Sequence, residues 1–137
     1  IRHFSMKRRR MHRSSDLFLT SSGRIGRPAF IGGALVVLAL WAAFDLLSPL
    51  MVRDFTGWIV AATLLYSAAC LLSQRLHDRG RSGWWSGLIL LAFAMAWPRP
   101  QAPIDWVALG LMLVIAIDLA LLPGQKTFNR YGAPPKA

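Results

Sequence analysis

Cysteine and acidic residues are scarce in this sequence, which has one cysteine, Cys70, and only six acidic residues. A single cysteine excludes a disulfide framework and any metal site built from several cysteines. Only 16% of the residues are charged, whereas about a quarter are charged in ordinary soluble domains. The sequence is therefore unlike that of a soluble domain, and its 137 residues favour a single domain.

Apolar and basic residues, in contrast, are abundant. Hydrophobic residues account for 55% of the chain, and its mean hydropathy is +0.42. Six Trp and seven Phe exclude a disordered chain, because so many large aromatic side chains must be buried. Sixteen Lys and Arg residues give a formal net charge of +10. These features indicate a small membrane protein with a strongly basic surface.

Long stretches without charge predict where the chain crosses the membrane. Charged residues are absent from 28–44, 55–74, 82–98 and 106–117. A membrane-spanning helix needs about 20 mainly apolar residues, so we predict spans at 29–48, 56–73, 83–97 and 105–122. The segments are apolar on all sides, which disfavours a soluble bundle because its helices would carry a polar stripe. The predicted fold class is an all-α membrane protein, a four-transmembrane-helix bundle.

Local residues predict the ends of the first two spans. Pro28 suits the first turn of a helix, and Ser48-Pro49 ends the first span because the residue before proline avoids the α conformation. Asp54 or Thr56 is a candidate cap for the second span. The third span is the weakest, because residues 83–97 extend only about 22 Å as a helix.

The distribution of Lys and Arg predicts the orientation. Nearly all of these residues lie before the first span, between the second and third, or after the fourth, and only Arg53 and Arg99 fall on the other side. The positive-inside rule then places both termini and the middle loop in the cytoplasm. We divide the chain into a basic N-terminal tail (1–22), a transmembrane domain (23–135) and a short end (136–137).

The basic run Lys7–Arg10 predicts one kind of partner for the tail. Basic residues near a membrane surface are attracted to anionic phospholipid headgroups. Nucleic acid is the other partner that such runs bind, but the run is tethered beside a membrane. We therefore expect anionic lipid and no nucleic acid as the partner.

Three motifs lie in the segments that this topology places in the cytoplasm. The first is Gly23-Arg24-Ile25-Gly26-Arg27-Pro28-Ala29-Phe30. The second is Arg75-Leu76-His77-Asp78-Arg79-Gly80-Arg81-Ser82-Gly83-Trp84-Trp85. The third is Pro123-Gly124-Gln125-Lys126-Thr127-Phe128-Asn129-Arg130-Tyr131-Gly132-Ala133-Pro134-Pro135. Because all three lie on one side of the predicted membrane, we expect them to meet.

Together the three motifs resemble those of a bacterial inner-membrane family, domain of unknown function 805 (DUF805, YhaH-like). The resemblance covers about residues 20–135, and the second motif is long and specific. The third motif departs from the family pattern at Thr127-Phe128 and at Ala133-Pro134. The resemblance implies a multi-pass protein of the bacterial inner membrane with four spans, and it implies no activity.

Five arginines in the first two motifs are candidates for binding anions: Arg24, Arg27, Arg75, Arg79 and Arg81. Such a cluster of cations needs anions beside it, and the arginine fork binds carboxylate or phosphate bidentately. Two interpretations follow. The cations either form a structural clasp and bind phospholipid headgroups, or they bind a phosphorylated or other anionic ligand.

The remaining motif residues favour structural roles. His77 beside Asp78 invites a catalytic interpretation, with His77 as a general base. However, adjacent residues rarely face one another, and no nucleophile motif accompanies them, so we expect His77 to bind a loop carbonyl or to cap a helix. We assign structural roles to His77, Asp78, Ser82, Trp84, Trp85, Asn129, Arg130 and Gly132.

Two acidic residues, Asp45 and Asp118, lie inside the predicted spans. An acid in a membrane span is a functional-site hypothesis by default, and these two would suit a proton or cation relay. The alternative is that Asp118 pairs with Arg75, Arg24 or Arg27, and that Asp45 faces water or Arg53. The two acids lie toward opposite ends of their spans, so we do not expect them to pair with each other.

Three functions remain open from the sequence. We expect an integral inner-membrane protein that is not an enzyme, an accessory or scaffold subunit whose Arg-rich face binds anionic phospholipids or other integral membrane subunits. The alternative is a small transporter or channel module that uses Asp45 and Asp118. A lipid-modifying enzyme centred on His77 is the third. We expect no catalytic residue, metal site or cofactor.

Overall fold

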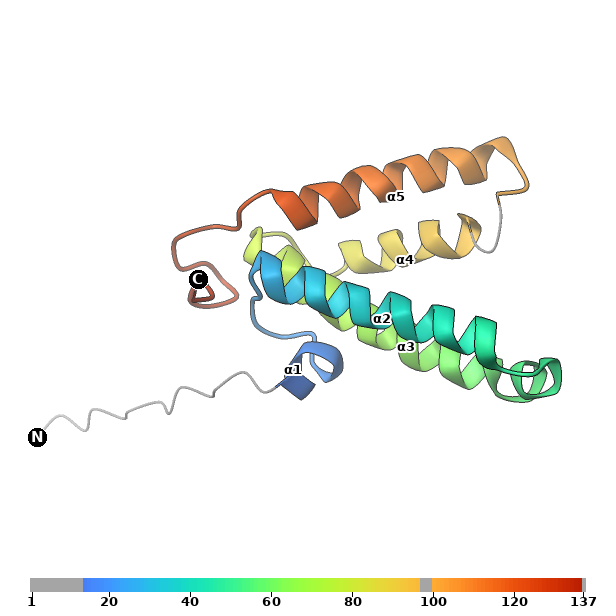
Figure 1. Cartoon of the computed structure of the whole chain (residues 1–137). Coiled ribbons are helices and arrows are strands. Elements are labelled where there is room, and N and C mark those ends of the chain that lie inside the picture. Colours follow the sequence, from blue (N-terminus) through green and yellow to red (C-terminus); the bar gives the residue numbers. More distant parts are fainter. Residues whose placement is uncertain (1–13, 97–99, 137) are drawn as a thin grey trace, which may run out of the picture.

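The computed structural model describes residues 14–96 and 100–136, and within these ranges the fold is all helical. Its five helices are α1 (Ser14–Leu19), α2 (Arg27–Leu47), α3 (Leu50–Asp78), α4 (Trp85–Ala96) and α5 (Pro103–Leu121). Figure 1 shows two antiparallel pairs side by side, α2 with α3 and α4 with α5. The short helix α1 packs against α3. The basic run Lys7–Arg10 lies outside the described residues.

Three of the helices are long and apolar enough to span a membrane: α2, α3 and α5. In the most apolar part of each, only 11–17% of the residues are buried inside the protein, so most of this apolar surface faces outward. A soluble protein does not leave helices this apolar uncovered, whereas lipid chains cover them without cost. The chain is thus built as a membrane protein.

Two of the predicted spans match their helices closely. The predicted 29–48 corresponds to α2 (Arg27–Leu47), which has Pro28 in its first turn, and the predicted 105–122 corresponds to α5 (Pro103–Leu121). The predicted 83–97 corresponds to α4, which has 12 described helical residues and is shorter than the three candidate spans.

The second predicted span, 56–73, is only the apolar middle of α3. α3 has 29 residues, which extend about 43 Å, so both of its ends carry polar turns. The prediction that Asp54 or Thr56 caps this helix is wrong. Only two residues separate α2 from α3, and Pro49, whose ring fixes φ, is the cap from which α3 starts at Leu50.

A small core lies where the helices meet. It contains Ile25, Phe30, Val37, Leu64, Leu71, Leu76, Ile89 and Leu119. Gly33 lets α2 approach α3 closely, because a Cβ at this position would lie 2.6 Å from Cδ2 of Leu71. Trp41 of α2 meets Phe93 of α4 edge to face, with ring centroids 5.7 Å apart. The first contact closes the α2–α3 pair, and the second joins the two helix pairs.

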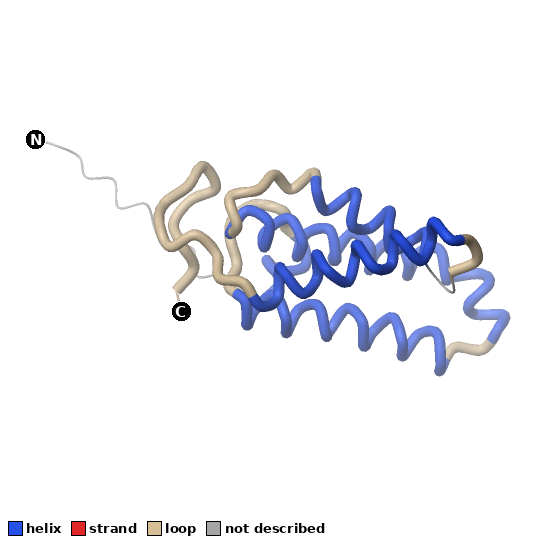
Figure 2. The backbone as a smooth tube through the Cα atoms, turned by 90° about the horizontal axis from the view of Figure 1, so that it is seen from above, coloured by secondary structure: helices blue, strands red, loops and turns tan. Residues whose placement is uncertain are grey.

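The loops that carry the three motifs gather at one end of the bundle (Figure 2). This end holds the segment before α2, the turn between α3 and α4, and the segment after α5. Here we call this end the motif end and residues 123–136 the exit segment. The opposite end holds the α2–α3 turn.

α1 belongs to this folded end of the protein. The side chains of Leu17 and Phe18 pack against the core, although the sequence analysis placed them in a basic tail. Gln74 of α3 donates hydrogen bonds from its amide to the carbonyls of Asp16, Leu17 and Thr20. α3 therefore holds the end of α1 in place.

Candidate functional site

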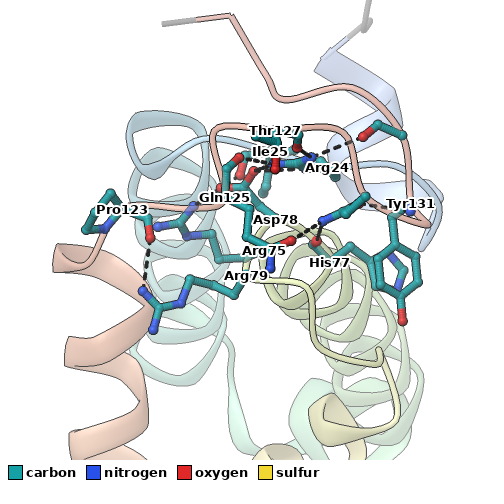
Figure 3. Close-up of polar contacts among 12 residues, drawn as sticks. Arg24, Ile25, Arg75, His77, Asp78, Arg79, Pro123, Gln125, Thr127 and Tyr131 are labelled. Carbon is teal, nitrogen blue, oxygen red and sulfur yellow. Dashed lines mark hydrogen bonds and ion pairs between the residues drawn. The ribbon is translucent and has the colours of Figure 1, made fainter.

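The carboxylate of Asp78 lies at the centre of the motif end, between two arginines (Figure 3). Arg24 donates to Oδ1 of Asp78 from Nε at 3.1 Å and from Nη2 at 2.9 Å. Arg75, one helical turn before Asp78, donates from Nη1 to Oδ2 at 2.5 Å. The three side chains are at most 3% exposed. We call this group of three residues the clasp.

Within the clasp, Arg24 also binds the exit segment. Nη1 of Arg24 donates to the carbonyls of Thr127 at 2.9 Å and Gly132 at 3.0 Å, and Nη2 also donates to the carbonyl of Gln125. All five N–H groups of this guanidinium are therefore occupied inside the protein. Arg24 thus ties the segment before α2 to the segment after α5.

Arg75 is bound in a similar way, to the end of α5. Its Nε donates to the carbonyl of Leu119 at 2.7 Å, and its Nη2 donates to that of Leu122 at 2.6 Å. A third carbonyl, that of Ile25, lies 3.4 Å from Nη1. The C-terminal carbonyls of a helix carry partial negative charge, so they help to balance the second buried cation.

These contacts bear on the two interpretations of the arginines. Arg24 and Arg75 are both buried and donate to groups of the protein itself. The anion that they bind is Asp78. For these two residues the structure matches the clasp interpretation, and external anions are left to Arg27, Arg79 and Arg81.

Backbone geometry brings the exit segment against the clasp. The N–H of Gln125 donates to the carbonyl of Asp78 at 2.8 Å. Gly124 passes so close that a Cβ on it would lie 1.8 Å from Oδ2 of Asp78. Gly80, with φ at +74°, ends α3 in the left-handed conformation that favours glycine. Any larger residue at Gly124 would displace the carboxylate.

His77 points away from Asp78, as the sequence analysis expected of adjacent residues. Its Nδ1 lies 3.1 Å from the carbonyl of Gly23, which agrees with the expected contact to a loop carbonyl. Its ring stacks on that of Tyr131, with centroids 3.8 Å apart and planes 9° apart. The imidazole is thus held between the segment before α2 and the exit segment (Figure 3).

Asn129 and its neighbours form a tight turn over His77. Nδ2 of Asn129 donates to the carbonyl of His77 at 3.0 Å, and Oδ1 accepts the N–H of Tyr131 at 2.9 Å. Gly132 closes the turn with φ at +120° and exchanges backbone hydrogen bonds with Asn129. Arg130 lies over the ring of Tyr131, with Cζ 4.8 Å from its centroid. The turn positions the carbonyl of Gly132 for Arg24.

The loop between α3 and α4 is more open. The N–H of Trp84 donates to Oγ of Ser82 at 3.4 Å. The side chain of Trp84 is 89% exposed and that of Trp85 is 50% exposed. Exposed tryptophans at the end of an apolar helix are typical of the membrane–water interface.

The two acids of the predicted spans pair with arginines at opposite ends of the bundle. Asp118 pairs with Nη2 of Arg79 at 3.2 Å, so the expected partners Arg75, Arg24 and Arg27 were wrong. Arg75 is unavailable because it is bound to Asp78 and to the end of α5. Asp45 lies 3.9 Å from Nη1 of Arg53, which is the partner expected for it.

Sequence reasoning missed several residues that build the motif end. Gln74 is fully buried and holds α1. Ser73 donates to Ser86 at 3.2 Å and so links α3 to α4. Gln125 accepts a hydrogen bond from Asn129 through Oε1 at 2.8 Å. The available signal was the pair of polar residues Ser73 and Gln74 within an otherwise apolar helix, directly before the second motif.

The chemical capacity of the site follows from these contacts. The polar groups of the clasp are satisfied by one another, and no three His, Cys, Asp or Glu residues of the described chain gather as metal ligands. Cations that are not buried surround the clasp: Arg27, Arg79, Arg81, Lys126, Arg130 and Lys136. The arrangement can hold three chain segments together and present positive charge to its surroundings.

Comparison with known proteins gives a family and two relatives. Residues 18–133 match the family described as "Protein of unknown function (DUF805)". The chain is 31% identical over 124 residues to "Uncharacterized protein YiiR" of Escherichia coli strain K12, covering 80% of this chain and 82% of the relative. The protein of the same description from Escherichia coli O157:H7 gives the same values. No solved structure matches the chain.

Proposed function

The chain belongs to the DUF805 family, and we propose that it is a non-enzymatic accessory or scaffold protein of the bacterial inner membrane. It crosses the membrane four times, with the short helix α4 as the third span, and both of its termini lie in the cytoplasm. Its motif end faces the cytoplasm and presents a basic surface to anionic phospholipids or to the subunits of a larger membrane complex.

The clasp is the observation that carries this proposal. An enzyme must keep polar groups free for its substrate, but here Asp78, Arg24 and Arg75 are turned inward and bind one another and backbone carbonyls. The three motifs therefore maintain the shape of one end of the bundle. The exposed cations around the clasp are the groups that remain for a lipid or a protein partner.

The charge distribution supports the orientation. The cations around the clasp lie at the motif end, whereas the described part of the opposite end carries Arg53 alone, beside Asp45 and Asp54. The positive-inside rule assigns the more basic end to the cytoplasm. An even number of spans then places both termini on that side.

The ion pairs give no support to the transporter alternative. Asp45 and Asp118 each lie beside an arginine, at opposite ends of the bundle. A relay needs acids that can exchange a proton or cation along a path, and these two are joined by no polar chain among the residues that the structure describes.

Cysteine labelling tests the orientation. In a Cys70→Ser background, one cysteine is introduced at Ser48 or at Arg81. Spheroplasts, whose inner membrane is intact and accessible from outside, are treated with an impermeant maleimide. We expect labelling of Ser48→Cys and protection of Arg81→Cys until the membrane is permeabilised. The reverse pattern would overturn the proposed orientation.

Gentle extraction tests the scaffold role. We expect the protein to leave the membrane with bound anionic phospholipid or with other integral subunits, detected by native mass spectrometry. A monomer that carries neither, extracted under conditions that keep known membrane complexes intact, would contradict the role.

A further inference from the structure

A cavity of about 340 Å³ opens at the motif end, between the start of α2 and the exit segment. The start of α2 contributes Gly26, Arg27 and Pro28 to its wall, and the exit segment contributes Gly124, Lys126 and Lys136. Its size lies within the range of about 300–1,000 Å³ that is usual for small-molecule sites. The cavity adjoins the clasp, because Asp78 and Arg75 also line it.

Four cations line this cavity, and the charge of three of them, Arg27, Lys126 and Lys136, is not neutralised by the protein. Arg27 donates from Nη1 to the carbonyl of Leu121 at 2.9 Å, which fixes its position and leaves its other N–H groups available. Lys126 and Lys136 have no polar partner for their ammonium groups within the described chain. The one acid in the wall, Asp78, already binds Arg24 and Arg75.

The start of α2, whose second residue Pro28 has no N–H, lies in the wall of the same cavity. Gly26 is the cap of this helix and has no side chain to bind the first-turn N–H groups. Helix starts that lack such a cap attract anions, because their N–H groups and the helix dipole point outward. The helix start only reinforces a site that the three cations and the cavity define.

The apolar surroundings suggest how a lipid would reach the cavity. Leu121 and Leu122, at the end of α5, are 63% and 46% exposed, and Leu121 carries the carbonyl that fixes Arg27. The cavity, whose wall includes Arg27 and Pro123, therefore lies next to the end of α5, although Leu121 and Leu122 are not part of the wall itself. This arrangement suits a headgroup whose acyl chains run along α5.

We propose that this cavity binds a phosphate group through Arg27, Lys126 and Lys136, and that an anionic phospholipid headgroup supplies it. The proposal rests on the proposed function for the orientation that brings the motif end to the headgroup region. The binding chemistry itself is that of phosphate with arginine and lysine, which a free phosphate shares.

The experiment compares two double variants with equal loss of charge. Lys126→Gln with Lys136→Gln removes two cations of the cavity. The matched control, Arg81→Gln with Arg130→Gln, removes two exposed cations of the same end that do not line it. The full chain is purified in dodecyl maltoside, a detergent without phosphate, and its apparent affinity for dioleoyl-phosphatidylglycerol is titrated by native mass spectrometry.

We expect the cavity variant to bind phosphatidylglycerol about 10- to 30-fold more weakly, since each basic residue beside a headgroup contributes about one kcal/mol. The control removes cations that would act on a bilayer surface, which is absent in detergent, so its affinity for a single lipid should change by less than about twofold. Arg27→Gln, a third variant, should weaken binding in the same direction. Equal weakening by both double variants would overturn the proposal, because it would indicate a diffuse field and no site. Absence of binding to the wild type would overturn it as well.

Inorganic phosphate separates the two sources of the group. If millimolar phosphate displaces the lipid from the wild type but not from the cavity variant, the result supports a site for phosphate itself. If the wild type keeps its lipid in the presence of phosphate, the result supports a site for the whole headgroup. The experiments distinguish failure of the proposed function from failure of the cavity site. Inverted cysteine labelling would remove the proposed function and leave phosphate binding in detergent intact, whereas equal weakening would remove only the cavity site.

Discussion

Asp78→Asn is the sharpest perturbation of the motif end. The substitution keeps the size of the side chain and removes the one negative charge between two buried guanidinium groups. Asparagine retains one oxygen for either arginine, but its amide then points N–H groups at the other. At least one of Arg24 and Arg75 therefore loses its partner and remains buried.

The expected cost follows from this geometry. Removing one partner of a buried ion pair costs about 3–5 kcal/mol, because a charge is left uncompensated. Both arginines keep their backbone carbonyls, such as those of Gly132 and Leu119. We therefore expect a loss near the lower limit, about 3 kcal/mol of unfolding free energy.

Asp118→Asn is the matched control. It makes the same chemical change in an ion pair whose side chains are 18% and 36% exposed. Exposed pairs contribute about 0–1 kcal/mol, and Arg79 keeps its hydrogen bond to the carbonyl of Pro123. The difference between the two variants isolates the effect of burial from that of charge.

Two assays measure the effect. Titration with SDS in mixed micelles gives the unfolding free energy of each variant. Trypsin, which cleaves after Lys126 and Arg130, reports local release of the exit segment, and a loss of 3 kcal/mol would speed cleavage by up to about 100-fold. If Asp78→Asn lost no more stability than Asp118→Asn and left cleavage unchanged, the clasp would not be what holds this end together.

Two further substitutions test the helix packing and the stacked rings. Gly33→Ala should cost about 1–3 kcal/mol, because its Cβ would lie 2.6 Å from Cδ2 of Leu71, so that this buried side chain would have to shift. Gly32→Ala, with nothing within 4 Å, should cost nothing in the same SDS titration, and equal effects would contradict the close approach. Tyr131→Leu should cost about 0.5–1.5 kcal/mol by removing the stack on His77, and trypsin cleavage after Arg130 should accelerate; an unchanged cleavage rate would show that the stack does not secure the exit segment.

The apolar parts of the fold were predictable from the sequence because hydropathy is a local property. α2 and α5 begin and end within two residues of the predicted spans. The ends of α3 were not predictable in this way. The helical hydrogen bonds of α3 start directly after Pro49 and continue through Ser73–Asp78. The stretch without charge indicates only the part of this helix that is suited to lipid.

The candidate site was predictable in its location but not in its pairings. One-sided topology implied that the three motifs meet, and they do. Which arginine binds which acid depends on where the end of α5 lies relative to α3. Arg75 and Asp78 lie one helical turn apart and pair with each other, so Asp118 is left to Arg79. The spacing of Arg75 and Asp78 is a local pattern, but no local pattern places Arg79 beside Asp118.

The clasp also imposes an order of events on the making of the protein. Arg24 binds Asp78, which lies 54 residues later in the chain, and its carbonyl acceptors lie 101 to 108 residues later. The ribosome therefore delivers Arg24 long before the groups that satisfy it. Until Asp78 has been synthesised, Arg24 has no anion to pair with, and until the segment from Gln125 to Gly132 follows, three of its five N–H groups have no acceptor. A chain cut short before that point would lack the acceptors through which Arg24 ties the segment before α2 to the exit segment.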